Sequence, residues 1–227
     1  MEVLTDIPVR FQFEDVLKRL NLRQKNEGME KSIHELIEKV LPIAKPKVVY
    51  KVAYVDNKNG DSLDIGGVRF TSRLLRINLD EVGRVFPFVA TCGMELEEIQ
   101  VPSSEFVKSF CLDQIKEMVL ESAYNYLEDY LKRRYGLGQI SDMEPGSLES
   151  WPITQQKELF SIFGNVEDLI GVRLTERFLM VPLKSVSGIF FPTEISFASC
   201  QLCLRKKCSH RRAPYDPELA KKYSEEA

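Results

Sequence analysis

The sequence predicts an α+β protein, with a twisted antiparallel β-sheet and flanking helices. Three observations support this class. The predicted strands and helices occur in blocks and do not alternate, as they would around a parallel sheet. Neither a Gly-rich dinucleotide fingerprint nor a Walker A loop follows a predicted strand. The chain has 227 residues, 44% of them hydrophobic and 29% charged, which is enough for one large globular domain or two small ones.

Two helices are predicted before the first long strand. Asp15–Leu20 is a short amphipathic turn or helix. A second helix is indicated by apolar residues at helical spacing over Ile33–Leu41, and it is closed by Pro42 and Pro46.

The predicted strands follow as a second block. Val48–Val55 is rich in β-branched and aromatic residues, which favours a strand, and Asp56–Gly60 has the composition of a turn. Leu63–Ile65 and Val68–Phe70 form a hairpin pair around two glycines. Val85–Thr91 is a buried strand.

The longest helix is predicted from Ser103 to about Tyr135, with hydroxyl residues at its start and Gly136 as its stop. Ile140–Trp151 is predicted as a loop that contains Pro145-Gly146. A further helix covers Gln155–Phe163 and ends at a glycine.

The segment Leu174–Phe191 predicts two apolar strands, Phe178–Leu183 and Ile189–Phe191, around the polar linker Lys184–Gly188. Small hydroxyl residues before a glycine allow a ligand to approach the backbone. An ordinary hairpin turn is the alternative interpretation of this linker.

Three of the five cysteines follow as Cys200-x2-Cys203-x4-Cys208. Thiolates at this spacing can bind an iron–sulfur cluster or zinc, with His210 or Cys92 as a candidate fourth ligand. A redox thiol pair and three reduced thiols without a metal are the alternatives.

Composition excludes several classes of function. The net charge of −3 gives no reason to expect nucleic acid. No apolar run approaches the roughly 18 residues of a membrane span. The acidic N-terminus lacks the apolar region of a signal peptide, so we expect a cytoplasmic protein. With two histidines and no nucleophile elbow, a Ser-His-Asp triad is not expected.

Three blocks together resemble the activation domain of vitamin B12-dependent methionine synthase. The segment LTERFLMVPLKSVSGIFF is similar to the family's L-T-E-x-F-x-M-x-P-x-x-S-V-S-G signature. Glu121–Glu128 resembles the family's helix that carries an S-adenosylmethionine-binding glutamate, and Glu121 is the matching position. Glu144-Pro145-Gly146, followed by Trp151-Pro152, resembles the loop with a Pro-Gly-Tyr motif.

The resemblance covers residues 85–195 well and residues 1–80 faintly, which predicts one domain over 1–195 and a cysteine-containing extension over 196–227. The family's aspartate near the N-terminus of the domain is not identifiable in this sequence, and two further positions depart from the family pattern. Asp142 stands where the family has an arginine, and Ser147 stands where it has a tyrosine. Arg133, Arg134 or Trp151 are candidates to replace the missing groups in part.

The resemblance implies a set of site residues. The S-adenosylmethionine-binding residues would be Glu121, Pro145, Gly146, Ser185, Ser187 and Gly188. Ser147 and Trp151 would face the corrinoid.

The implied function is that of a stand-alone reactivation subunit, which is a component of methionine synthase activity and not a complete enzyme. It would support reductive methylation of cob(II)alamin on a partner, with flavodoxin or ferredoxin as electron donor. The alternatives are an activator of another corrinoid methyltransferase, a non-catalytic metal-binding interaction module with the same fold, and a small S-adenosylmethionine-dependent methyltransferase with another acceptor.

Overall fold

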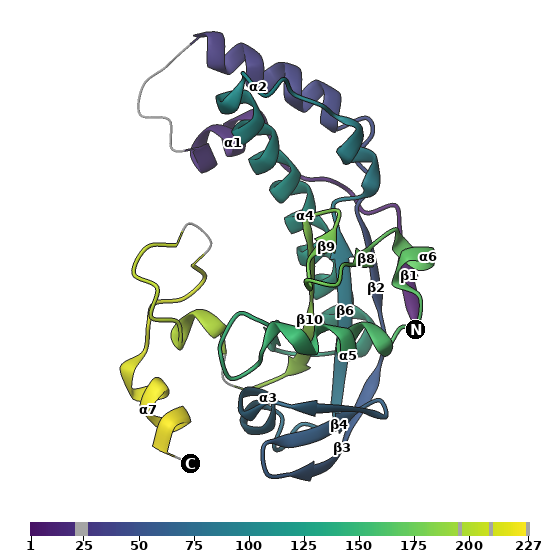
Figure 1. The fold of residues 1–227 in the computed structure, drawn as a ribbon, viewed down its shortest axis with the longest axis vertical. Coiled ribbons are helices and arrows are strands. Elements are labelled where there is room, and N and C mark those ends of the chain that lie inside the picture. The colour runs from purple at the N-terminus through teal and green to yellow at the C-terminus, as the bar shows by residue number, and fades with distance from the viewer. Residues whose placement is uncertain (21–26, 195–196, 209–210, 226–227) are drawn as a thin grey trace.

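The computed structural model describes residues 1–20, 27–194, 197–208 and 211–225. Its architecture confirms the predicted class, an antiparallel sheet with flanking helices (Figure 1). The elements in chain order are β1 (Glu2–Leu4), α1 (Phe13–Leu20), α2 (Glu27–Val40), β2 (Lys47–Tyr50), β3 (Ala53–Asn59), β4 (Ser62–Ile65), β5 (Val68–Thr71), α3 (Arg73–Asn78), β6 (Arg84–Thr91), η1 (Met94–Glu98), α4 (Phe106–Tyr135), β7 (Ile140–Met143), η2 (Ile153–Gln155), α5 (Gln156–Ser161), α6 (Val166–Ile170), β8 (Arg173–Leu174), β9 (Met180–Val181), β10 (Ser185–Pro192), η3 (Ser199–Gln201) and α7 (Pro217–Glu225).

Strand β6 is the centre of the sheet. It pairs with β2 and β3 and also with β10, and β10 pairs in turn with β7, all antiparallel. Residues 84–91 of β6 are buried except for the first, because layers of side chains cover both faces of this strand. A strand buried on both faces reads as a continuous apolar run, and the sequence of β6 has this form.

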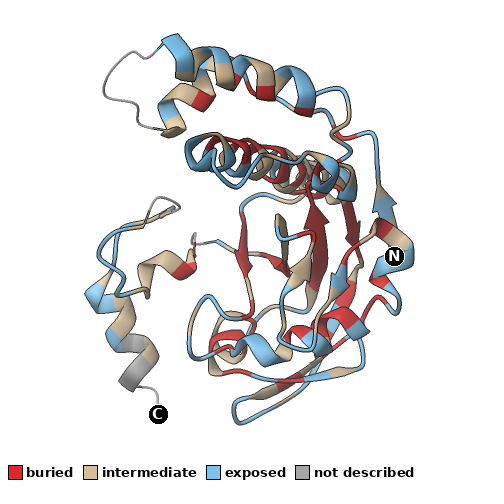
Figure 2. Cartoon of the chain, turned by 45° about the horizontal axis from the view of Figure 1, so that its top comes forward, coloured by how far each residue is buried: buried red, intermediate tan, exposed pale blue. Residues whose placement is uncertain are grey.

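Buried residues lie on both faces of the sheet (Figure 2), and they form two separate core clusters. Phe86 and Phe88 of β6 pack with α1, α2 and α4 on one face. Val85 and Val89 pack with α3, α5, α6 and the hairpin strands on the other. The alternation of neighbouring β6 side chains between the clusters is the period of two that a strand imposes.

Helix α4 runs beside the central strands along much of the molecule (Figure 1). It buries Leu112, Ile115, Val119 and other residues at spacings of three and four, the pattern of a core-facing helix. It ends at Gly136, as predicted, in the left-handed conformation with φ 61°. The predicted serine cap at its start is wrong, since the N-cap is Glu105 and makes no side-chain cap hydrogen bond.

Several element boundaries differ from the sequence predictions. Val48–Val55 is divided between β2 and β3, both paired with β6, and β3 continues through most of the predicted turn to Asn59. The predicted loop at Ile140 begins with strand β7. Of the predicted strand Phe178–Leu183, only Met180–Val181 is extended and paired.

The largest difference concerns Ser185–Gly188. These residues are not a linker but the first half of β10, in register with β6 from Ser185 opposite Thr91 to Phe190 opposite Phe86. Small polar residues lack the apolar alternation of a half-buried strand, and for this reason the sequence pattern favoured a turn.

The C-terminal segment packs against the domain. Leu219 and Tyr223 of α7 contact the cluster that contains α3 and α5. The Tyr223 hydroxyl donates a hydrogen bond to Asn78 Oδ1 at 2.8 Å, and its ring stacks on Phe197. The predicted boundary between residues 195 and 196 lies outside the described residues. None of the described helices is both long enough and apolar enough to cross a membrane.

Candidate functional site

A pocket of about 550 Å³ lies between α4, the loop after β7, strand β10 and the C-terminal segment. Its volume is within the range of roughly 300–1,000 Å³ typical of small-molecule sites. The residues that line it are Arg19, Glu117, Leu120, Glu121, Tyr124, Asn125, Glu144, Ser147, Val186, Ser199, Cys200, Cys203, Arg211 and Arg212. Each of the three sequence blocks that carry the family resemblance therefore contributes to one pocket.

Helix α4 supplies one wall through side chains at helical spacing. Glu117, Glu121 and Tyr124 are three and four positions apart and share a face. The predicted ligand residue Glu121 is already paired, because Arg19 of α1 donates to both of its carboxylate oxygens, from Nη1 to Oε2 at 2.7 Å and from Nη2 to Oε1. Glu117 is likewise paired with Lys184 at 2.8 Å.

The loop after β7 supplies the opposite wall. Gly146 has φ 83°, and a Cβ there would lie 2.9 Å from Ile153 Cδ1, so both conformation and space favour glycine. Its N–H donates to the carbonyl of Trp151 at 2.8 Å. Ser147 lines the pocket, and its hydroxyl donates to the carbonyl of Glu144 at 2.6 Å. Pro145 is buried beneath the loop.

The corrinoid-facing role predicted for Trp151 is not supported by its position. Its side chain is fully buried, and its ring meets Phe70 edge to face with centroids 6.3 Å apart. A tryptophan in a polar loop has the composition of an exposed ligand contact, but here the ring fills the core under the loop. Of the two residues predicted to face a corrinoid, Ser147 alone is exposed at the pocket.

The two signature serines do not line the pocket. Ser187 is 3% exposed, and its hydroxyl accepts a hydrogen bond from Gln156 of α5 at 2.9 Å. Ser185 donates to the carbonyl of Pro182 at 2.8 Å. Because β10 alternates, Ser187 lies on the α5 side of the sheet, and Val186 lies on the pocket side. Contact of S-adenosylmethionine with backbone groups of Ser185 and Ser187 therefore stays a prediction, and their side chains are engaged within the protein.

Gly188 has a packing function. A Cβ at this position would lie 2.5 Å from the carbonyl oxygen of Met143 in β7 and 3.2 Å from Glu144 Cγ. Only glycine permits β7 to approach β10 at this distance. Gly188 is not among the residues that line the pocket, and its contact with the ligand stays a prediction.

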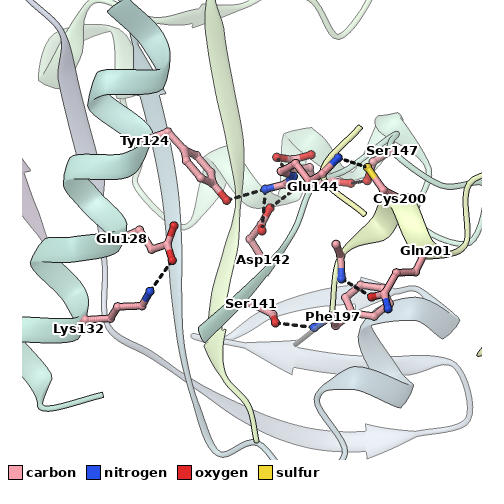
Figure 3. Close-up of polar contacts among 12 residues, drawn as sticks. Tyr124, Glu128, Lys132, Ser141, Asp142, Glu144, Ser147, Phe197, Cys200 and Gln201 are labelled. Atoms are coloured by element: carbon pink, nitrogen blue, oxygen red, sulfur yellow. Dashed lines mark hydrogen bonds and ion pairs between the residues drawn. The ribbon is translucent and has the colours of Figure 1, made fainter. Parts of the chain in front are cut away.

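An ionic cluster around Asp142 contributes to the lining of the pocket (Figure 3). Arg212 donates to both carboxylate oxygens of Asp142, at 3.0 Å each, and to the Tyr124 hydroxyl at 2.9 Å. Glu144 Oε1 lies 3.7 Å from Arg212 Nη2. Figure 3 shows Tyr124, Asp142 and Glu144 converging from α4 and from the β7 strand and loop.

Burial changes the proton affinities in this cluster. It raises the pKa of Glu144 to about 7, and the nearby carboxylate of Asp142 contributes in the same direction. Burial also raises the pKa of Tyr124, so its hydroxyl stays protonated at neutral pH.

Sequence reasoning missed Arg212. Arg133 and Arg134 were the candidates to replace the cation absent at position 142, but the cation that binds Asp142 comes from the C-terminal segment, 70 positions away. The exchange of an arginine for an aspartate at this strand was a signal that a cation elsewhere had to compensate a buried carboxylate.

The C-terminal segment is organised by Arg211. Its guanidinium donates to the carbonyls of Cys200 at 3.0 Å, Ala213 at 3.2 Å and Cys203 at 3.3 Å, and also to that of Arg205. These bonds fold the cysteine segment into a compact wall whose Cys200 and Cys203 line the pocket.

Metal binding by Cys200, Cys203 and Cys208 stays a prediction. Within the described residues, no three His, Cys, Asp or Glu side chains are placed to hold a metal ion. His210 lies outside those residues. Cys92 is fully buried, and burial raises its pKa to about 12, which opposes the thiolate that a metal needs.

Comparison with solved structures identifies a similar fold. A crystal structure of the MetH reactivation domain bound to AdoHcy matches with a TM-score of 0.62 and 16% identity, over 88% of this chain and 81% of that chain. The chain has the fold of the MetH reactivation domain. No protein-family model and no curated protein matches the sequence. The family resemblance predicted from three short blocks is thereby confirmed at the level of the reactivation-domain fold.

Proposed function

We propose that the pocket binds S-adenosylmethionine and that the protein is a stand-alone reactivation subunit for a cobalamin-dependent methionine synthase or a related corrinoid protein. The observation that carries this proposal is the meeting of Glu121, Ser147 and Val186, from the three resembling blocks, at one pocket. The similar MetH reactivation domain was crystallised with AdoHcy, the demethylated form of the same ligand.

The chemistry of the pocket suits such a ligand. S-adenosylmethionine carries a sulfonium, an ammonium and a carboxylate, together with ribose hydroxyls and an adenine ring whose faces are apolar. The lining offers carboxylates at Glu121 and Glu144 for cations, the Arg212 guanidinium for the carboxylate, and Leu120 and Val186 for the apolar part.

The ligand would supply a methyl group when bound, and the protein supplies binding and orientation. Ser147 at the exposed rim marks the side at which a partner's corrinoid would approach. The electron for cob(II)alamin reduction would come from flavodoxin, ferredoxin or a similar donor. The five free cysteines agree with the reducing cytoplasm in which we place this reaction.

The proposed ligand binding is tested with a variant that places a large side chain at the rim of the pocket. Calorimetric titration of the wild type with S-adenosylmethionine should show saturable binding, and Ser147→Trp should weaken it at least about ten-fold because the indole occupies the rim. Glu149→Trp, on an exposed residue of the same loop that does not line this pocket, should bind normally.

A second assay tests the role. With a cobalamin-loaded partner and an electron donor, the wild type should accelerate loss of the cob(II)alamin absorbance, and Ser147→Trp should not. If the wild type has no effect on cob(II)alamin reduction or methylation, the proposed role is wrong.

The metal prediction has its own measurement. Iron, zinc and acid-labile sulfide can be determined on anaerobically purified protein, before and after exchange of Cys200 and Cys203 for serine. Metal-free protein with full reactivation activity would exclude a cluster at these cysteines.

A further inference from the structure

The acidic residues that line the pocket differ in how closely they are paired with a cation of the protein. Glu121 is held at both oxygens by Arg19, and Glu117 is held by Lys184 at 2.8 Å. Both of these carboxylates therefore already have close ionic partners from the protein itself.

Glu144 is different. Within the described part of the chain, its carboxylate has a single cation within 4 Å, Arg212, at 3.7 Å. That guanidinium directs its short bonds, at 3.0 Å each, to Asp142. Two carboxylates of one strand and loop thus share one cation, and the carboxylate that lines the pocket has the weaker contact.

Such an arrangement is costly in the empty pocket and favourable with a cation in it. The Glu144 side chain is 26% exposed, so it is largely desolvated without being fully paired. A cationic group that enters the pocket would supply the missing partner at charge-assisted hydrogen-bond strength.

We propose that Glu144, and not Glu121, makes the principal ionic contact with the cationic part of the ligand. This inference rests on the proposed binding of S-adenosylmethionine, whose ammonium and sulfonium are both cations. Glu121 then acts through its pair with Arg19, which fixes α1 against α4 beside the pocket.

The test is calorimetric titration of wild type, Glu144→Gln and Glu149→Gln. Glu144→Gln keeps the shape of the side chain and removes its charge, so S-adenosylmethionine should bind about 10- to 100-fold more weakly. Glu149→Gln removes one charge from the exposed part of the same loop and should bind within about two-fold of the wild type.

S-adenosylhomocysteine distinguishes the two cations, because it keeps the ammonium and lacks the sulfonium charge. Equal loss for both ligands in Glu144→Gln assigns the contact to the ammonium. Loss for S-adenosylmethionine alone assigns it to the sulfonium. Either result supports the inference.

The failures are also distinguishable. If the wild type binds S-adenosylmethionine and Glu144→Gln binds it equally well, the inference is wrong and the proposed function stands. If the wild type binds neither ligand, the proposed function fails, and the inference fails with it.

A stability measurement shows whether Glu144→Gln folds and whether Glu144 is the strained carboxylate. Burial raises its pKa from 4.5 to about 7, so between these values the folded state holds a proton that the unfolded state has lost. Its contribution to the free energy of unfolding therefore falls as the pH rises from about 4.5 to 7. Glu144→Gln should lack this decline and should gain stability relative to the wild type at about pH 8.

The charged and titratable groups around Glu144 are the same in the variant. They are Arg19, Glu117, Glu121, Tyr124, Asp142, Cys200, Cys203, Arg211 and Arg212. If the free energy of unfolding declines equally steeply in both proteins between about pH 4.5 and 7, the decline belongs to one of these groups, and the strained state of Glu144 is contradicted.

Discussion

Arg212 and Asp142 connect the chain's last segment to the sheet. The Asp142 side chain is 8% exposed, and the Arg212 side chain is 40% exposed and lies over the Tyr124 ring, 5.8 Å from its centroid. A buried carboxylate without a cation is strongly disfavoured. Removal of Arg212 should therefore destabilise the protein mainly because it leaves Asp142 unpaired, and less because the attraction within the pair is lost.

Arg212→Ala should therefore lower the free energy of unfolding by about 1–3 kcal/mol, measured by urea denaturation at neutral pH. Lys206→Ala removes a cation from an exposed position in the same segment and should change stability by less than about 0.5 kcal/mol. Adding Asp142→Asn to Arg212→Ala should recover part of the loss. Equal stability of the two alanine variants would show that the pair holds nothing in place.

The sequence predicts which segments meet at the pocket better than it predicts their contacts. Glu121, predicted to bind the ligand, Ser147, predicted to face a corrinoid, and Cys200 and Cys203, predicted to bind a metal, line the pocket, whereas Pro145 and Gly146 do not. Arg212 was missed because no local pattern relates two residues 70 positions apart. The pairing of Glu121 was invisible for the same reason, since its partner Arg19 lies on another helix.

At the scale of elements, the chain follows its local signals where these are strong. The blocks of strands, the buried run of β6 and the long helix α4 were all predicted from period and composition. The short elements α3, α6 and β1 were not, because three to six residues carry too little periodicity. Ser185–Gly188 became a strand through pairing with β6, which overrides weak local preference.

The C-terminal cap of α4 predicts that glycine is needed at position 136 and not two residues later. Gly136 has φ 61°, and a Cβ there would meet no atom within 4 Å, so Gly136→Ala should cost only the left-handed backbone conformation, about 1–2 kcal/mol. Gly138, two residues later, also has open space and no positive φ, so Gly138→Ala should be neutral or slightly stabilising. Thermal unfolding of both variants measures the difference, and the reverse order would contradict this account of the cap.

At the scale of the whole molecule, the pocket is assembled from distant parts of the chain. Helix α1, helix α4, the loop after β7 and the segment after residue 197 all contribute lining residues. The segment that begins at Phe197 also packs on the second core cluster, through Phe197 itself and Leu202, so pocket and core share this wall. Ligand binding should therefore reduce the local opening of this segment.

Hydrogen exchange can follow this effect. With saturating S-adenosylmethionine, amides of residues 199–208 and 211–213 should exchange more slowly than in the free protein, because their opening would break ligand contacts. Amides of the β3–β4 hairpin, which lies at the far end of the sheet in Figure 1, should be unchanged. Uniform slowing of all amides, or none in the C-terminal segment, would contradict its role as a wall of the pocket.

Gly188 shows how a signature motif can matter without meeting a ligand. Its missing side chain sets the spacing between β10 and β7, and that spacing places Asp142 and Glu144. A methyl group there would clash with the Met143 carbonyl and with Glu144 Cγ. It would therefore displace β7 and, with it, the Glu144 side chain that lines the pocket. This position of the motif thus requires glycine because β7 approaches β10 so closely. In related chains, the residue at this position should co-vary with residues of β7.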